Sequence, residues 1–279
     1  MVTNNRFGTI AVHALLMIGV ALMCLPIWLT FVGSTVTQAE IVRPPLPMLP
    51  GGQLVENYSA ALFGHEGRTP VARMLFNSTV MALGIAIGKI VISLLSAFAI
   101  VYFRFPGRML CFWTIFATLM LPVEVRIVPT YQVAVNLGLL NSYAGLILPL
   151  IASATATFLF RQFFMTVPDE LVEAARMDGA GPMRFFRDIL LPLSITNIAA
   201  LFVILFIYGW NQFLWPLLVT TDPDMNTIVM GIKQMLPSAD DYGDWPVTMA
   251  TAILAILPPV FVVLAMQRLF VRGLIDSEK

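Results

Sequence analysis

Residues 10–36 read IAVHALLMIGVALMCLPIWLTFVGSTV and contain no Asp, Glu, Lys or Arg. A helix needs about 20 apolar residues to cross the hydrocarbon core of a bilayer. The stretch is also longer than the apolar part of a cleaved signal peptide, which is typically about 7–15 residues. The sequence therefore predicts a membrane-spanning helix here. Pro26 is tolerated in it if neighbouring helices satisfy the freed backbone groups.

The whole chain is also rich in apolar residues. Of its 279 residues, 58% are hydrophobic and 11% are charged, whereas an ordinary soluble domain is about 25% charged. This composition excludes a soluble enzyme and a disordered chain, and the net charge of zero gives no basic surface for nucleic acid. We expect an all-α polytopic membrane protein with one transmembrane domain, residues 1–279. Its six predicted spans lie at about 10–36, 76–103, 109–131, 143–164, 193–213 and 245–267.

The distribution of Lys and Arg predicts the orientation of these spans. With the amino terminus inside, the inner segments carry ten of these residues and the outer segments four. Cytoplasmic loops of membrane proteins are enriched in Lys and Arg. We therefore expect both termini, and the segment at about 166–192, on the cytoplasmic side.

That cytoplasmic segment reads TVPDELVEAARMDGAGPMRFFRDILLP. Thr166 and Asp169 fit a helix-capping pattern, and Gly179 is expected to end the helix in a left-handed conformation. Pro182 can begin a further helix. These features alone leave two alternatives open, an ordinary interfacial linker helix and a docking surface for another protein.

The spacing of certain residues in the segment distinguishes these alternatives. Glu173-Ala174-Ala175, Gly179 and Ile189-Leu190-Leu191-Pro192 follow the pattern EAA-x3-G-x9-I-x-L-P. This pattern resembles the EAA loop of ABC importer permeases, and every fixed position is present. The resemblance implies a type I importer permease core, in which the loop is a coupling helix that docks on an ATPase subunit. The residues implied to couple are Glu173, Ala174, Ala175, Gly179, Ile189, Leu191 and Pro192.

Other parts of the chain resemble permeases of sn-glycerol-3-phosphate importers within that family, namely residues 120–130, 152–165, 208–216 and 270–279. The resemblance implies import of this solute across the bacterial inner membrane by alternating access. It also implies a second homologous permease, two cytoplasmic ATPase subunits and a periplasmic substrate-binding protein as partners. Two alternatives are a permease for another small solute, such as a sugar or a glycerophosphodiester, and a passive facilitator.

The sequence contains no pattern for catalysis or metal binding. Its two cysteines and two histidines form no ligand cluster. Residues 84–90, GIAIGKI, resemble a phosphate-binding loop, but three residues rather than four separate the glycines, and Ile follows Lys89. We expect a non-catalytic subunit that binds no cofactor, with ATP and Mg²⁺ held by the partner ATPase.

Besides Arg161 at the inner end of the fourth predicted span, three charged residues fall inside predicted spans. Lys89 lies near the middle of the second span, where insertion scales give a penalty of roughly 2.5–3.5 kcal/mol for a charge. Its side chain either binds an anionic substrate or has a structural role, in which it pairs with a carboxylate or carbonyl groups of the protein or extends toward the interface. Glu124 and Arg126 lie near the outer end of the third span and either anchor it at the interface or line the substrate path. We predict that Arg126 captures phosphate near the outer mouth and that Lys89 meets it at the midplane.

Overall fold

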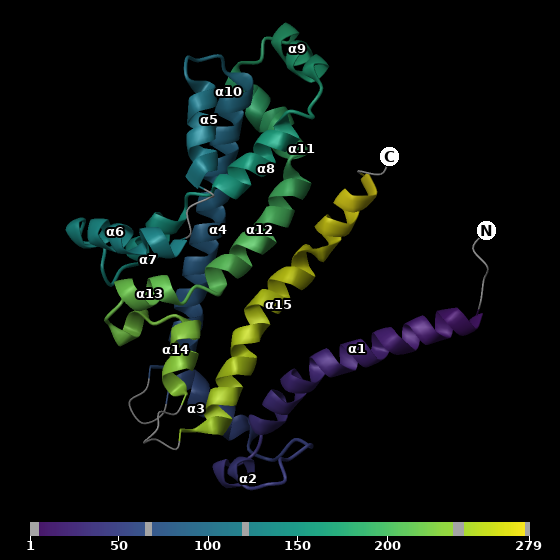
Figure 1. Ribbon diagram of the computed structural model, residues 1–279, viewed down its shortest axis with the longest axis vertical. Helices are drawn as coiled ribbons and strands as arrows, with labels where there is room; N and C mark the ends of the chain where they lie inside the picture. Colours follow the sequence, from purple (N-terminus) through teal and green to yellow (C-terminus); the bar gives the residue numbers. More distant parts are fainter. Residues whose placement is uncertain (1–5, 65–68, 119–122, 237–242, 277–279) are drawn as a thin grey trace. The chain divides into compact units, whose positions relative to one another are not determined.

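The computed structural model describes residues 6–64, 69–118, 123–236 and 243–276, and within these ranges the chain forms helices and no strand (Figure 1). The first elements are α1 (Arg6–Gly33), α2 (Gln38–Val42), α3 (Leu54–Phe63), α4 (Val71–Tyr102), α5 (Arg108–Ala117), α6 (Val123–Asn136), α7 (Tyr143–Ile147) and the 3-10 turn η2 (Leu148–Leu150). They are followed by α8 (Ala154–Phe164), α9 (Asp169–Met177), α10 (Pro182–Phe185), the π-helical turn η3 (Phe186–Leu190), α11 (Leu191–Leu193) and α12 (Ile195–Trp210). The last are α13 (Leu214–Val219), the 3-10 turn η4 (Pro223–Met225), α14 (Ile228–Met235) and α15 (Trp245–Asp276).

Three of these helices are long and apolar enough to cross a membrane. Within the described residues they are Gly8–Gly33 of α1, all of α4, and Trp245–Gln267 of α15. The number rises to five if each of two bent helix pairs is one span. The predicted third span, 109–131, includes residues 119–122, which lie outside the described residues. The count of six and the cytoplasmic position of both ends therefore stay predictions.

The first bent pair falls in a predicted span, and the second joins the predicted cytoplasmic segment to the predicted span 193–213. Tyr143–Leu150 and Ala154–Phe164 meet at 50°, and Pro182–Leu193 and Ile195–Trp210 meet at 72°. The predicted span 143–164 is therefore two helices rather than one. Ser153 explains the new start, because its extended backbone leaves the helix and its side chain accepts a hydrogen bond from the amide of Ala156.

The chain divides into two compact units, which are described separately. The first unit comprises residues 1–73 and 231–257. Within it, the end of α1 lies beside the start of α15 (Figure 1), and Gly33 is in close contact with Met249. The side chain of Asn57 donates hydrogen bonds to the carbonyls of Ser34 and Val36, which fixes α3 to the end of α1.

Helix α2 of the same unit begins with a capping box. Thr37 accepts a hydrogen bond from the amide of Glu40, and the backbone amide of Thr37 donates to the Glu40 carboxylate at 2.8 Å. The backbone and side-chain hydrogen bonds from Thr37 hold the pKa of that carboxyl below its usual range. The box satisfies amides at the start of a helix only five residues long.

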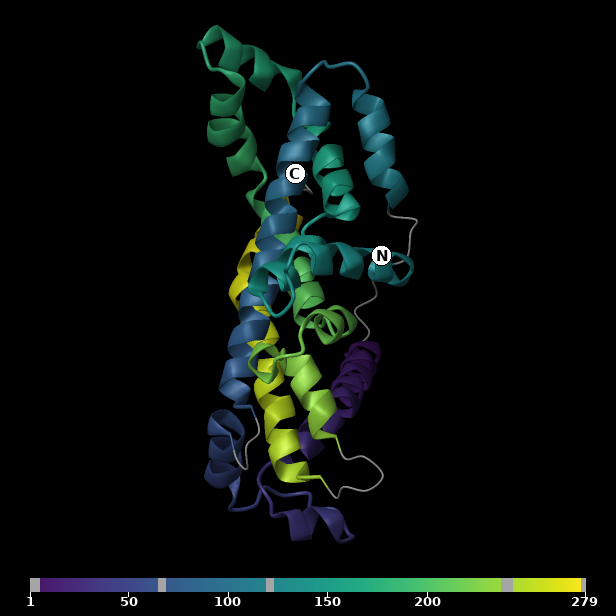
Figure 2. The ribbon, with the colours of Figure 1, turned by 90° about the vertical axis from the view of Figure 1, so that its left-hand side faces the viewer.

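The second unit comprises residues 74–230 and 258–279. Its helices α5 and α8 are in contact, and α13 packs against α6 and α7 (Figure 2). Trp215 of α13 is buried in a cluster with Met81 and Ile85 of α4 and donates its indole N–H to the carbonyl of Gly145. Helix α4 therefore makes apolar contacts with both α7 and α13 in this unit.

A buried amide ties the chain after α13 to α4. Asn77 is 0% exposed, and its Nδ2 donates to the carbonyls of Asp224 and Asn226 at 2.8 and 2.9 Å. The hydroxyl of Tyr143 donates to its Oδ1 at 2.7 Å. One side chain thus joins α4, α7 and the turn η4, and all of its hydrogen bonds stay within this unit.

Candidate functional site

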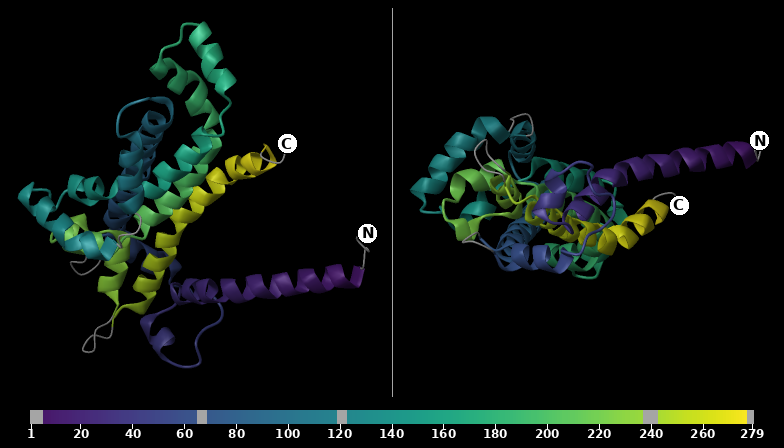
Figure 3. Two further views of the ribbon diagram at one scale, coloured as in Figure 1. Left: turned by 45° about the horizontal axis from the view of Figure 1, so that its top comes forward. Right: turned by 90° about the horizontal axis from the view of Figure 1, so that it is seen from below.

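The segment that carries the EAA pattern begins with α9, which projects from its unit (Figure 3). The first turn of α9 contains Asp169 and Glu170, and the last turn contains Arg176. Negative charge at the start of a helix and positive charge at its end both stabilise the helix dipole. The predicted cap at Thr166 is wrong, because the helix is preceded directly by Pro168 and the Thr166 hydroxyl donates to the carbonyl of Phe163.

Gly179 ends α9 as the sequence predicts. Its φ is +71°, in the left-handed region that side chains with a Cβ resist. The amide of Gly179 donates to the carbonyl of Arg176 at 3.0 Å, and the amide of Ala180 donates to the carbonyl of Ala175 at 2.9 Å. These two hydrogen bonds form a Schellman motif. The turn after α9 is thus closed by its own backbone.

A continuous helical segment with an irregular turn connects this loop to α12. Pro182 begins α10 as predicted, and the π-helical turn η3 follows it. Pro192 has no amide hydrogen and cannot form the usual helical bond at that position. The amide of Leu191 donates five residues back, to the carbonyl of Phe186, and Ser194 marks the 72° bend into α12. The predicted transition at Pro192 therefore takes the form of a π-helical turn and a sharp bend.

The residues of the EAA pattern differ in exposure. Glu173, Ala174, Gly179 and Pro192 are exposed, Ile189 and Leu191 are half-buried, and Ala175 is buried. Glu173 and Ala174 are therefore available on the surface of α9, whereas Ala175 packs inward. Their coupling role stays a prediction.

Two exposed methionines beside the turn were missed in the sequence. Met177 is 83% exposed and Met183 is 64% exposed, and they lie on either side of Gly179 in the chain. Methionine is flexible and apolar, and it suits surfaces that bind a partner. The available signal was their position in the segment predicted to be cytoplasmic, where apolar side chains would have no membrane to enter.

A cavity of about 400 Å³ lies between α4, α5, α6, α8 and α12 of the second unit. Both predicted basic residues, Lys89 of α4 and Arg126 of α6, line it. None of the described residues that line it is acidic. Side-chain hydroxyls provide most of its other polar lining, from Ser96, Thr114, Thr118, Ser153, Thr155 and Thr157.

Lys89 is held against an aromatic ring. It is 7% exposed, and its Nζ lies 3.7 Å from the centroid of the Tyr208 ring. The negative face of an aromatic ring attracts a cation but does not neutralise it. No ion pair joins Lys89 to a carboxylate among the side chains that the structure describes. Both alternatives for Lys89, contact with an anionic substrate and a structural role, stay predictions.

The break between η2 and α8 opens onto the same cavity. Ala152 and Ser153 of the break and Ala154 and Thr155 of the first turn of α8 line it. Irregular backbone at membrane depth is tolerated where it lines a cavity, and a helix amino terminus favours negative charge. The dipole of α8 therefore adds to the two cations.

The structure describes the side chain of one of the two remaining charged residues of the predicted substrate path, Arg126, but not that of Glu124. Arg126 lines the same cavity as Lys89, and the division of their roles between an outer mouth and the midplane stays a prediction. The side chain of Glu124 lies outside the described residues, and its role stays a prediction.

The close packing of α4 explains how the broken segment reaches Lys89. A Cβ on Gly88 would lie 2.6 Å from the side chain of Ile151, and a Cβ on Gly84 would lie 2.6 Å from that of Ile147. A larger side chain at either position would force the facing isoleucine to move. The glycines that resemble a phosphate-binding loop in the sequence are thus packing residues in the middle of a helix.

Comparison with known families and proteins gives consistent matches. The family described as binding-protein-dependent transport system inner membrane component matches residues 89–276. The chain is 61% identical over 282 residues to the sn-glycerol-3-phosphate transport system permease protein UgpE of Rhizobium meliloti, with 100% of both chains covered. It is 58% identical over 281 residues to the protein of the same name from Salmonella typhi, again with 100% of both chains covered.

A solved structure has the same fold. It belongs to a bacterial ABC transporter involved in the import of the acidic polysaccharide alginate, and the TM-score is 0.82. The match covers 96% of this chain and 98% of that chain at 20% sequence identity. At this identity the likeness concerns the fold alone, and it confirms the predicted all-helical permease fold.

Proposed function

The chain belongs to the family of binding-protein-dependent transport system inner membrane components of ABC importers, and we propose that it is the permease subunit through which sn-glycerol-3-phosphate enters the cell. The protein is a multi-pass membrane protein. We place it in the bacterial inner membrane with both termini in the cytoplasm, in keeping with the excess of Lys and Arg in the inner segments.

The observation that carries the proposal is the cavity with two cations. A phosphate ester has between one and two negative charges near neutral pH, since its second pKa is about 6. An anion that leaves water needs charge or hydrogen-bond donors in return. Lys89, Arg126 and the first turn of α8 supply both. The hydroxyls of the lining suit the two hydroxyl groups of the glycerol part.

The two cations have different parts in this proposal. Arg can bind phosphate through two parallel hydrogen bonds, whereas Lys acts as a point charge. Lys89 is buried against Tyr208 and cannot follow the substrate far, whereas the more exposed Arg126 can reorient. Arg126 therefore receives the phosphate and Lys89 holds it during the change of access.

ATP hydrolysis belongs to partner subunits in this proposal, and this chain binds no cofactor. Two cytoplasmic ATPase subunits, a second homologous permease and a periplasmic binding protein complete the importer. Glu173, Ala174, Met177 and Met183 form the exposed surface that would meet an ATPase subunit. ATP-driven closure of the ATPase pair would displace α9 and, through the bend at Ser194, shift α12.

The positive charge of the cavity distinguishes the proposed substrate from the alternative solutes. A neutral sugar has no charge to balance Lys89 and Arg126, so these cations favour an anionic solute. A glycerophosphodiester carries one negative charge and stays the nearest competitor. A passive facilitator has no need of a segment with the complete EAA pattern.

The test is ligand-stimulated ATP hydrolysis by the complete complex in lipid nanodiscs. We expect binding protein loaded with sn-glycerol-3-phosphate to stimulate hydrolysis and, in proteoliposomes, to drive uptake. Glycerol and maltose are neutral controls, and glycerophosphocholine represents the diesters. Equal stimulation by maltose, or uptake that persists without the ATPase subunits, would contradict the proposal.

A further inference from the structure

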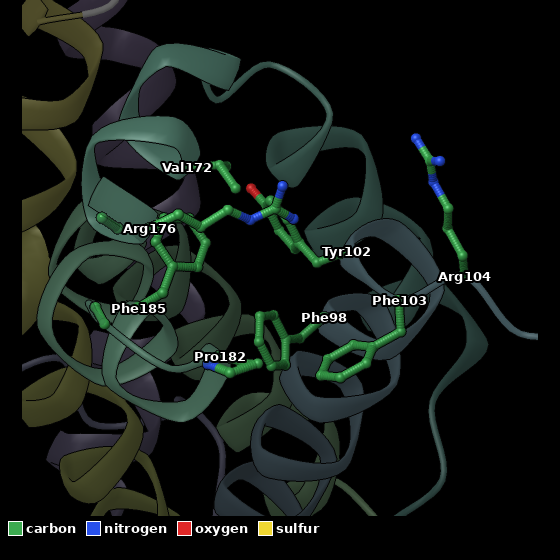
Figure 4. A pocket seen from close by; sticks show the side chains of 10 residues that line it. Phe98, Tyr102, Phe103, Arg104, Val172, Arg176, Pro182 and Phe185 are labelled. Atoms are coloured by element: carbon green, nitrogen blue, oxygen red, sulfur yellow. The ribbon is translucent and has the colours of Figure 1, made fainter. Parts of the chain in front are cut away.

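A second pocket lies in the same unit, where the end of α4 meets α9 and α10. Its volume is about 500 Å³. Aromatic side chains make up much of its wall, as Figure 4 shows for Phe98, Tyr102, Phe103 and Phe185. The ring centroids of Phe98 and Phe103 are 5.3 Å apart, as are those of Tyr102 and Phe185. These ring contacts give the pocket a preformed apolar wall that spans α4 and α10.

Two arginines complete this pocket. Arg176 comes from the last turn of α9, and Arg104 follows α4 at the edge of the pocket (Figure 4). None of the described lining residues is acidic. The ion pairs of the segment, among its described residues, join Arg184 and Arg187 to Asp188 and do not involve either pocket arginine. The pocket thus combines an aromatic wall with two guanidinium groups that form no ion pair with a described carboxylate, although the Asp169 carboxylate is close enough to Tyr102 to interact with it electrostatically.

The position of the pocket along α4 suggests its environment. The candidate membrane span of α4 ends at Tyr102, and Arg104 follows two residues later. Tyr and Arg at the end of a span are typical of the level of the lipid headgroups. Basic pockets on the cytoplasmic side of membrane proteins bind the headgroups of acidic lipids. An occupant from the bilayer would reach this pocket without crossing the aqueous phase.

We propose that the pocket binds one acidic phospholipid, with its phosphate at Arg176 and Arg104 and its adjoining apolar atoms against the rings of Phe98 and Tyr102. Charge complementarity favours a lipid with net negative charge over a zwitterionic one. The pocket is separate from the cavity of Lys89, so this inference goes beyond the proposed transport function. The bound lipid would contact both α4 and α9, and it would stabilise the arrangement in which the EAA segment is held against the end of the span.

Lipid retention by the assembled transporter tests the proposal directly. The purified complex is titrated with dioleoyl phosphatidylglycerol and, separately, with dioleoyl phosphatidylcholine, and the bound lipids are counted by native mass spectrometry. We expect one phosphatidylglycerol to bind at least about tenfold more tightly than phosphatidylcholine, because the choline ammonium offsets the phosphate charge and is repelled by the two arginines. Arg176→Gln should remove this preference.

Two further variants separate the pocket from general surface charge. Arg187→Gln removes a positive charge from the same segment, but its side chain is 85% exposed and does not line the pocket. It should leave the preference unchanged. Ala180→Leu narrows the pocket without changing charge and should weaken phosphatidylglycerol binding.

Two results would overturn the proposal. They are equal retention of the two lipids, and an equal loss of the preference in Arg187→Gln and Arg176→Gln. Since the measurement counts bound lipid, its outcome does not depend on which solute is transported.

Discussion

The Nζ atom of Lys89 on α4 lies 3.7 Å from the centroid of the Tyr208 ring on α12. The ring holds the ammonium group at the cavity wall and leaves its charge in place. Because the two residues belong to different helices, a movement of α12 relative to α4 changes the position of the charge. The position of the Lys89 charge, which we propose to bind the substrate, therefore depends on how α4 and α12 are arranged.

Lys89→Met tests the role of this charge. The variant should insert at least as well as the parent, because it removes a charge from a span. Uptake of phosphate ester should fall by about tenfold or more, since hydrogen bonds to charged groups contribute about 1.5–3 kcal/mol. The measurement is uptake by the reconstituted complex, normalised to the amount in the membrane. Lys233→Met, at an exposed position in α14, is the control and should leave uptake unchanged.

Arg126→Gln tests the second cation of the cavity. Arg126 lines the cavity but is exposed, so the substitution should insert normally. We expect a higher substrate concentration for half-maximal uptake, and a smaller effect on maximal uptake than that of Lys89→Met. If both variants keep the parent's maximal uptake and half-saturation, the two cations are structural and the anion path lies on the partner permease.

Gly179→Val tests the turn after α9. A left-handed conformation costs a residue with a Cβ roughly 1–2 kcal/mol, and open space around Gly179 means that the effect comes from the backbone alone. We expect uptake and ligand-stimulated ATP hydrolysis to fall together while the amount in the membrane stays normal. Gly181→Val is the matched control, because Gly181 also has open space around it but its φ is −71°. Equal losses in the two variants would show that bulk, not conformation, is responsible.

Glu173→Lys reverses the charge on the exposed surface of α9. The expected result is weaker retention of the ATPase subunits when the complex is purified through this chain. Glu173→Gln should have a smaller effect because it removes the charge without reversing it. Glu170→Gln changes an exposed acid outside the EAA pattern and serves as the control. Full ATPase retention and uptake in Glu173→Lys would exclude Glu173 from the docking surface.

Asn77→Leu should lower the free energy of unfolding, with a smaller effect on the transport activity of the protein that remains folded. The substitution removes three hydrogen bonds, each with a net contribution of about 1 kcal/mol, so we expect a loss of about 3 kcal/mol. Tyr143→Phe removes one of the three and should lose about a third as much. Thermal unfolding in detergent measures both effects. An unchanged unfolding temperature in Asn77→Leu would mean that water replaces this amide.

Local features of the structure could be predicted from the sequence where one residue determines the backbone. The glycine of the EAA pattern predicts a left-handed turn, and Gly179 has it. Pro182 predicts a helix start, and α10 begins there. The cap at Thr166 was wrong because Pro168 already fixes the backbone before α9, so the helix begins without a capping side chain.

Features that depend on distant contacts could not be predicted. Residues 143–164 are mostly apolar, and an apolar run does not by itself fix where the backbone bends. Pro149 and Ser153 were the only local signals of the break. The contact of Lys89 with Tyr208 joins residues more than a hundred positions apart, so it follows only from the packing of α4 and α12.

The Schellman turn after α9 has a mechanical consequence. Its hydrogen bonds, from Gly179 to Arg176 and from Ala180 to Ala175, lie within the segment. The turn is therefore stiff whether or not a partner is bound, and a push on α9 is passed to α10 with little deformation. We expect deformation to occur instead at the 72° bend before α12, where Pro192 interrupts the helical bonding. We therefore expect α9 and α10 to move together as one body about this bend. A substitution that makes the bend more rigid would reduce the movement passed to α12 without changing how α9 binds its partner.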